Sequence, residues 1–267
     1  MRLGIISLCL GILYFSVFKS MVQDWINLPD YSHGFFIPFI ALYLVWERRD
    51  KLDTLPVLPN NAGIIIILSG LFLLLLGNIA AESFTMRFSF LFVLSGIILF
   101  LLGWPHLKAL LFPVLFLIFM IPIPSILMVK ITFPMQLFAS RVATESLQLF
   151  GIPVLREGNI IHLAHTTLDV AEACSGIRSL ISLLALGTIF AYLTQKIFWK
   201  RVVLVLSCFP IAIVVNALRV SATGILANHY GIKAAEGFFH GFSGYLLFVF
   251  AFMLMFLTGS LLGKLQQ

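Results

Sequence analysis

The sequence predicts an all-α polytopic membrane protein with about eight transmembrane helices and one small extended segment. Of its 267 residues, 61% are apolar and only 10% are charged, and the mean hydropathy is +1.08. A soluble domain carries about 25% charged residues, so this chain has too little charge to cover a surface in water. These numbers exclude an ordinary soluble enzyme, a disordered chain, a disulfide scaffold and a nucleic-acid-binding module.

Eight segments are expected to cross the bilayer. A spanning helix needs roughly 17–25 apolar residues, because the hydrocarbon core is about 30 Å thick. Seven runs qualify by themselves, and an eighth qualifies when Tyr31 and Trp46 are taken as interfacial aromatic anchors. The expected spans are 3–18, 31–46, 62–80, 86–103, 107–122, 176–194, 202–226 and 241–262. We interpret the first as a retained helix, because no small-residue cleavage site precedes Lys19.

Two segments have a different pattern. In 123–150, prolines such as Pro134 interrupt the apolar run and charged residues are spaced along it, which favours an interfacial amphipathic or re-entrant segment. In 151–173, β-branched and polar residues alternate around a turn at Gly158, which favours a small hairpin on the outer face. The sequence contains no repeat and no soluble second domain, so residues 1–267 are expected to form a single integral membrane domain.

The basic residues predict the orientation of the chain. Cytoplasmic loops of membrane proteins carry an excess of Lys and Arg. If both termini are cytoplasmic, the cytoplasmic loops hold Arg48, Arg49, Lys51, Lys108, Lys196, Lys200, Arg201 and Lys264. The opposite short loops then hold Lys19, Arg87 and Lys233. This distribution explains the net charge of +6 without a nucleic-acid partner.

Three reactive side chains fall at one depth in this topology. Cys174 precedes the span at 176–194, Arg219 lies near the outer end of its span, and His240 comes directly before the last span. Polar and ionisable residues at a membrane are costly and therefore candidates for function. The alternation of the spans, rather than any sequence spacing, predicts that the three lie together on the outer side.

A thiol, a guanidinium and an imidazole together indicate nucleophilic catalysis. The positive end of a helix stabilises a thiolate at its N-terminus, where Cys174 is expected. Arg219 would lower the pKa of the thiol further, or hold the oxyanion of a tetrahedral intermediate. His240 would act as general base, or as general acid for the leaving amine. Arg178, one turn after Cys174, is a second candidate for charge stabilisation.

Each of these residues also has a simpler interpretation. Cys174 would be a packing residue, as most cysteines of membrane proteins are. Arg219 would extend its guanidinium to the interface, and Asn216 would only brace its helix. His240 would be an interfacial histidine without a role, or His229 would take its place.

Two further patterns carry little weight. His162 and His165 have the spacing of metal ligands but lack the glutamate of a His-Glu-x-x-His motif, so we expect no metal site and no cofactor. Gly241-Phe-Ser-Gly244 resembles the serine motif of rhomboid proteases, but no histidine follows Ser243 as those enzymes require. The glycines are expected to permit close helix packing.

Five short blocks resemble signature sequences of the exosortase/archaeosortase family. Three are Ala-Glu-Ala-Cys-Ser-Gly-Ile-Arg-Ser (171–179), Asn-Ala-Leu-Arg-Val (216–220) and Phe-His-Gly-Phe-Ser-Gly (239–244). The others are Tyr-Ser-His-Gly (31–34) and Arg-Glu-Gly-Asn (156–159). They occur in the family's order and extend over nearly the whole chain.

The resemblance implies a cysteine transpeptidase of the bacterial cytoplasmic (inner) membrane, with its active site facing the periplasm. Its partners would be exported proteins with a C-terminal transmembrane sorting signal of the Pro-Glu-Pro type, an amine, lipid or glycan acceptor, and membrane lipids. Cys174 would be the nucleophile, with Arg219 and His240 as the other catalytic residues. The supporting or substrate-binding residues would be Arg178, Asn216, Glu157, Asn159, Arg156 and His33.

Two alternatives stay open at this point. In one, water accepts the acyl group and the enzyme is only a protease. In the other, the chain is a non-enzymatic multi-pass component of polysaccharide export or transport. The second explains the spans and the basic charge but gives Cys174 no task.

Overall fold

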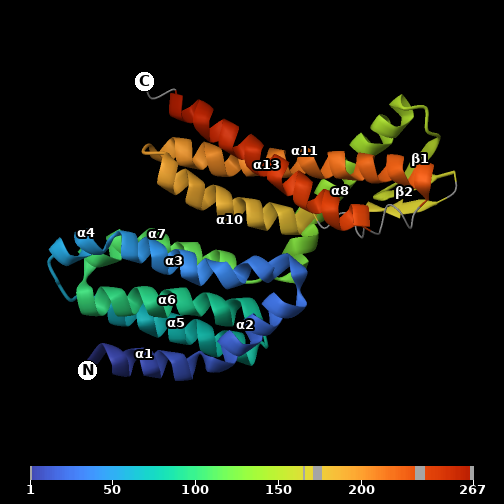
Figure 1. Ribbon diagram of the computed structural model, residues 1–267. Coiled ribbons are helices and arrows are strands. Elements are labelled where there is room, and N and C mark those ends of the chain that lie inside the picture. The colour runs from blue at the N-terminus through green and yellow to red at the C-terminus, as the bar shows by residue number, and fades with distance from the viewer. Residues whose placement is uncertain (1, 165, 171–175, 232–237, 265–267) are drawn as a thin grey trace. The chain divides into compact units, whose positions relative to one another are not determined.

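The computed structural model describes residues 2–164, 166–170, 176–231 and 238–264 (Figure 1). The chain forms two compact units, Met1–Pro124 (unit 1) and Ser125–Gln267 (unit 2), and each is described by itself. Helices dominate both units, because a helix satisfies its backbone polar groups internally and can therefore enter a bilayer.

Unit 1 is a set of helices joined by short turns. They are α1 (Arg2–Leu13), α2 (Phe15–Asn27), the 3-10 helix η1 (Pro29–Phe35), α3 (Phe36–Glu47), α4 (Arg49–Thr54), α5 (Ala62–Ile79), α6 (Ser83–Leu102), α7 (Trp104–Phe116) and the 3-10 helix η2 (Leu117–Met120). α5 packs on α6 through glycines one heptad apart. A Cβ atom at Gly70 would lie 2.9 Å from the backbone nitrogen of Val93, and one at Gly77 would lie 2.8 Å from that of Met86. The absence of these side chains lets the two helices approach closely.

Side chains satisfy backbone hydrogen-bonding groups at two places in the helices of unit 1. Glu82 caps α6, where its carboxylate accepts hydrogen bonds from the backbone N–H groups of Phe84 at 3.0 Å and Thr85 at 2.6 Å. α7 continues through Pro113, which has no N–H to donate to the carbonyl of Ala109. Arg48 Nη1 donates to that carbonyl instead. A side chain from the end of α3 thus completes the backbone hydrogen bonding of α7.

Among its described residues, unit 2 combines four helices with a small antiparallel sheet. Its elements are α8 (Ser125–Leu149), β1 (Val154–Glu157), β2 (Ile160–Leu163), β3 (Thr167–Asp169), α10 (Gly176–Thr194), α11 (Phe198–Tyr230) and α13 (Phe238–Lys264). The strands lie in the order β1-β2-β3, with Val154 opposite Leu163 and Ile160 opposite Asp169.

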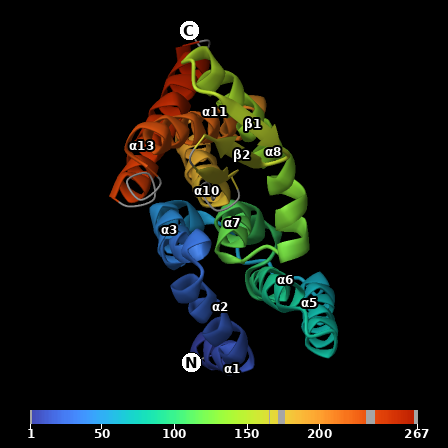
Figure 2. The ribbon, with the colours of Figure 1, turned by 90° about the vertical axis from the view of Figure 1, so that its right-hand side faces the viewer.

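α11 belongs to both hydrophobic cores of unit 2. Its first part, which includes Leu204 and Val215, packs with α10 and α13. Its second part, from Ala217 to Ala227, packs with α8 and the inner face of the sheet. Figures 1 and 2 both show the sheet against α8 and the second part of α11.

Helix length and composition support a polytopic membrane protein. Among the described residues, five helices are long and apolar enough to cross a bilayer: α5, α6, α8, α11 and the part Gly244–Lys264 of α13. The bent pair α1–α2 would make a sixth. The all-α polytopic class is therefore confirmed, whereas eight spans are not. The runs at 31–46 and 107–122 each divide between a 3-10 helix and a shorter α-helix, and the part Leu180–Thr194 of α10 is a further apolar helical segment.

The segment 123–150, expected to be interfacial or re-entrant, contains one continuous helix, α8, which passes through Pro134. Its length and composition place it among the candidate spans. A proline inside a helix removes one backbone hydrogen bond and does not have to end the helix when neighbouring elements pack against it. The segment at 151–173 forms the three short strands between 154 and 169.

Candidate active site

Arg219 lies on α11 where the two cores of unit 2 meet. α11 has 33 residues, which at 1.5 Å per residue makes it about 50 Å long. It is therefore longer than the hydrocarbon core of a bilayer, about 30 Å. Arg201 and Arg219 are eighteen residues apart on this helix, a rise of about 27 Å. If α11 crosses the bilayer, these two arginines can reach its opposite surfaces.

The start of α10 lies level with Arg219. α10 and α11 are antiparallel neighbours, and Gly187 of α10 lies against Cys208 Sγ of α11. Gly176 is eleven residues before Gly187, and Arg219 is eleven residues after Cys208. Because both helices rise at the same rate, Gly176 and Arg219 are at the same level of the bundle.

The start of α13 reaches the same level. A Cβ atom at Gly259 would lie 3.4 Å from Leu204, and one at Gly244 would lie 3.7 Å from Arg219 Nη2. Both contacts fit one antiparallel register of α13 against α11. Position 240 lies one turn before Gly244 in the backbone of α13. The first turn of α13 is therefore close to the level of Arg219.

The described residues contain only part of the expected catalytic group. Cys174 lies outside them, two residues before α10 begins at Gly176. Arg178 and His240 belong to the first turns of α10 and α13, but their side chains lie outside the described part. Arg219 is half-buried. Asn216, one turn earlier on α11, is buried, which fits a bracing role for this turn.

Three of the expected supporting residues lie in β1 or in the turn between β1 and β2, and they interact with neighbouring residues of the sheet. Arg156 Nη1 donates to the carbonyl of Gly158 at 3.0 Å. A carboxylate oxygen of Glu157 lies 3.3 Å from His162 Nε2. Asn159 Nδ2 donates to Asp169 Oδ1 at 3.1 Å. Arg156 and Glu157 are exposed, so their hydrogen-bonding groups remain accessible from outside the protein.

A sheet turn is also fixed to the adjacent helix. Ser140 Oγ of α8 donates to the Gly158 carbonyl at 2.9 Å.

Among the described residues, no three His, Cys, Asp or Glu side chains converge as metal ligands would, and His165 lies outside them.

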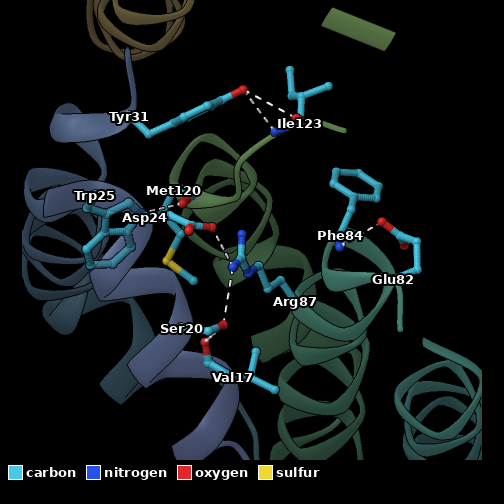
Figure 3. Close-up of polar contacts among 10 residues, drawn as sticks. All are labelled: Val17, Ser20, Asp24, Trp25, Tyr31, Glu82, Phe84, Arg87, Met120 and Ile123. Atoms are coloured by element: carbon cyan, nitrogen blue, oxygen red, sulfur yellow. Dashed lines mark hydrogen bonds and ion pairs between the residues drawn. The ribbon is translucent and has the colours of Figure 1, made fainter. Parts of the chain in front are cut away.

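His33 lies in unit 1, where its ring faces the backbone of η2. Its Nε2 is 3.1 Å from the carbonyl oxygen of Phe119. Two neighbours contact the same stretch: Trp25 Nε1 donates to the Met120 carbonyl at 2.8 Å, and the Tyr31 hydroxyl accepts from the Ile123 N–H at 3.2 Å (Figure 3). The structure thus gives His33 a role in holding unit 1 together.

Sequence reasoning missed a buried ion pair in unit 1. Arg87, expected in an outer loop, lies inside α6 with 5% of its side chain exposed, and its Nη2 is 2.6 Å from Asp24 Oδ2 of α2. The same nitrogen donates to Ser20 Oγ at 3.2 Å (Figure 3). The available signal was an acidic and a basic residue near the ends of two apolar runs. Their pairing was not visible, because 62 residues separate them in the chain.

Residues 25–257 match the model of the transmembrane exosortase family. The chain belongs to that family. Exosortases are membrane cysteine transpeptidases, and the matched range of this exosortase includes Cys174, Arg219 and His240. No curated protein and no solved structure matches the chain.

Proposed function

We propose that this exosortase is a cysteine protease and transpeptidase that cleaves a C-terminal Pro-Glu-Pro-type sorting signal from exported proteins. The observation that supports it most is the shared level of Gly176, Arg219 and the turn of α13 that contains His240. Gly176 follows Cys174 by two residues, so we expect the Cys174 thiol to lie close to the Arg219 guanidinium. This arrangement would give Cys174 a catalytic role. Cys174 would have no such role in a non-enzymatic transport component.

The proposed reaction has two steps. The Cys174 thiolate attacks the scissile carbonyl carbon, and Arg219 stabilises the resulting oxyanion. The oxyanion collapses, the carbon–nitrogen bond breaks, and His240 gives a proton to the leaving amine, which leaves a thioester. An acceptor amine then attacks the thioester and gives its proton to His240, and the Cys174 thiolate is released.

The other residues would support this reaction without touching the reacting atoms. Asn216 would hold the turn of α11 that contains Arg219. The glutamate of the sorting signal would pair with Arg178 or with the exposed guanidinium of Arg156. Glu157 and Asn159 would maintain the turn of the sheet, and His33 would maintain unit 1.

The same proposal includes an orientation. The chain would reside in the bacterial inner membrane with both termini in the cytoplasm and the site on the periplasmic side. The excess of basic residues in the expected cytoplasmic loops supports it.

The deciding experiment is coexpression with a substrate that carries the sorting signal, followed by mass spectrometry of its new C-terminus. We expect Cys174→Ala to abolish the cleaved product. The matched control is Cys9→Ala, because Cys9 is exposed on α1, far in sequence from the proposed site. Processing by Cys174→Ala at the normal rate would refute the proposal.

The same spectra identify the acceptor. A product that carries an added amine indicates transfer, and a free carboxylate indicates hydrolysis by water. Absence of cleavage by the unmodified enzyme with such a substrate would favour the non-enzymatic alternative.

A further inference from the structure

Unit 1 contains a partly open apolar cavity of about 450 Å³ lined by α2, α3, α6, α7 and η2. Its walls include Met21 and Trp25 of α2, Ala41 of α3, Phe90 of α6 and Val114 of α7. All of its lining side chains are apolar or aromatic. Water lacks hydrogen-bond partners in such a space, and an empty space deprives the walls of van der Waals contacts. An apolar molecule is therefore the expected occupant.

The dimensions of the cavity favour a narrow chain over a helix. Its lining extends from Pro38 to Val45 on α3 and from Phe90 to Ile98 on α6, which is about 10–12 Å along each helix axis. A transmembrane helix of a substrate would need a groove comparable to the hydrocarbon core, about 30 Å. A cavity two helical turns long can instead hold part of an acyl chain.

The cavity is bordered by a surface suited to lipid. Leu42 of α3 lines the cavity and is also 65% exposed. Phe39 and Tyr43, on either side of it in sequence, are exposed large apolar residues as well. In a membrane protein, an exposed apolar helix face of this kind contacts hydrocarbon. An acyl chain can therefore enter beside Leu42 directly from the bilayer.

Cationic residues lie at the end of the cavity that contains Val45 and Leu110. Arg48 follows Val45 by three residues, and its Nη1 donates to the carbonyl of Ala109, directly before Leu110. Lys108, on the same turn of α7, is exposed. Cationic pockets between transmembrane helices bind anionic lipid headgroups. The exposed Arg49 lies over the Trp46 ring at 4.6 Å and also pairs with Asp50.

We propose that this cavity binds one acyl chain of an anionic phospholipid of the surrounding bilayer, with the lipid phosphate near Arg48 and Lys108. The chain occupies the space between Ala41 and Trp25. This lipid site goes beyond the proposed peptidase function and does not depend on Cys174.

Trp25 provides a direct test, because its indole lines the cavity and only 7% of the residue is exposed. The full chain keeps Trp25 as its sole tryptophan through the substitutions Trp46→Phe, Trp104→Phe and Trp199→Phe. It is reconstituted in phosphatidylcholine vesicles that contain phosphatidylglycerol with brominated acyl chains. Bromine quenches tryptophan fluorescence at short range, so we expect Trp25 to lose most of its emission. Unchanged emission overturns the proposal.

Cavity-filling variants distinguish a bound chain from lipid outside the protein. In the same background, Ala41→Phe fills the cavity and is expected to restore the emission, and Ala41→Val is expected to restore part of it in a structure that is easier to fold. The matched control is Ala80→Phe, at an exposed position at the end of α5, which is expected to leave the quenching unchanged. Full quenching in both folded Ala41 variants would overturn the proposal, because bromine would then reach Trp25 without entering the cavity.

The headgroup assignment has its own comparison. We expect brominated phosphatidylglycerol to quench more strongly than brominated phosphatidylcholine at the same low mole fraction, and Lys108→Ala to reduce the difference. Equal quenching by the two lipids would overturn the anionic assignment.

Discussion

Arg87 of unit 1 and Arg219 of unit 2 both lie in apolar helices, but their surroundings differ. Arg87 is almost fully buried and is held by Asp24 at 2.6 Å and by Ser20. Arg219 is half-buried and lies beside Gly244, a residue without a side chain. The first arrangement joins two helices through side chains, whereas the second places a guanidinium beside the backbone of the neighbouring helix α13. An ionisable residue in a membrane helix therefore indicates function only after its neighbours are known.

The largest effect is expected from removing the Arg219 guanidinium. If it stabilises an oxyanion, Arg219→Ala lowers the rate of substrate cleavage on the order of 100-fold or more. Arg219→Lys keeps the charge but loses the planar fork, so an intermediate rate is expected. The measurement is the initial rate of product formation, with thermal unfolding as the control for folding. A normal cleavage rate for Arg219→Ala would show that Arg219 takes no part in the mechanism. The two arginines would then not differ in catalytic role.

The Asp24–Arg87 pair is expected to affect stability instead of chemistry, and its two members differ. Asp24→Ala leaves a buried cation without its carboxylate and is expected to cost about 3 kcal/mol of unfolding free energy. Arg87→Met should cost less, because 34% of the Asp24 side chain is exposed and water can solvate it. The double variant should be about as stable as Arg87→Met alone. Denaturant unfolding in detergent measures all three, and equal losses for the two single variants would contradict this account.

Gly244 tests the space beside Arg219 more finely. A Cβ atom at 244 would lie 3.7 Å from Arg219 Nη2, which is ordinary van der Waals contact, so Gly244→Ala should keep nearly normal activity. Gly244→Leu should displace the guanidinium and lower kcat on the order of tenfold. If KM and the unfolding temperature stay unchanged, the loss reflects positioning. Equal activity of the two variants would show that the position of Arg219 does not depend on this space.

The smallest effect concerns Glu82 at the start of α6. Burial would raise the pKa of Glu82, but hydrogen bonds from Thr85 and Phe84 and the charge of Arg87 outweigh burial and lower it. A lowered pKa in the folded state means that the ionised carboxylate stabilises the fold above the ordinary glutamate pKa of about 4.3. This contribution is lost as the pH falls through the lowered pKa.

Glu82→Gln removes the charge and should cost about 0.5 kcal/mol at neutral pH, the usual size of a charge–helix-dipole interaction. The difference in unfolding temperature between the two proteins should therefore shrink on acidification. If the difference in unfolding temperature is the same at neutral and acidic pH, the effect of Glu82→Gln reflects lost hydrogen bonding and not lost charge.

Much of the helical structure followed from local sequence. The runs at 62–80 and 86–103 become α5 and α6, because uninterrupted apolar residues favour helices that can be buried on all sides in a bilayer. Prolines were less informative. Pro134 and Pro113 both lie inside helices, and the contact that satisfies the carbonyl freed by Pro113 comes from Arg48, which is 61 residues from Ala109 in the chain.

The site was predictable only in its coarse outline. Alternating spans predicted that Arg219 and His240 fall at one depth, and the register of α11 against α13 supports this for Arg219 and the backbone turn of His240. The register itself depends on contacts such as Gly259 with Leu204, which no local pattern contains. The pairing of Asp24 with Arg87 was hidden for the same reason. Local sequence predicts elements, whereas long-range packing determines which side chains meet.

The length of α11 has a consequence for the membrane in which the protein works. About 27 Å separates Arg201 from Arg219 along the helix axis. In a bilayer of lipids with longer acyl chains, Arg219 would lie within the hydrocarbon core unless the tilt of α11 decreased. The strands and α8 pack against the second part of α11 and would move with it. If Arg219 acts as proposed, the thickness of the bilayer would therefore influence the position of its guanidinium.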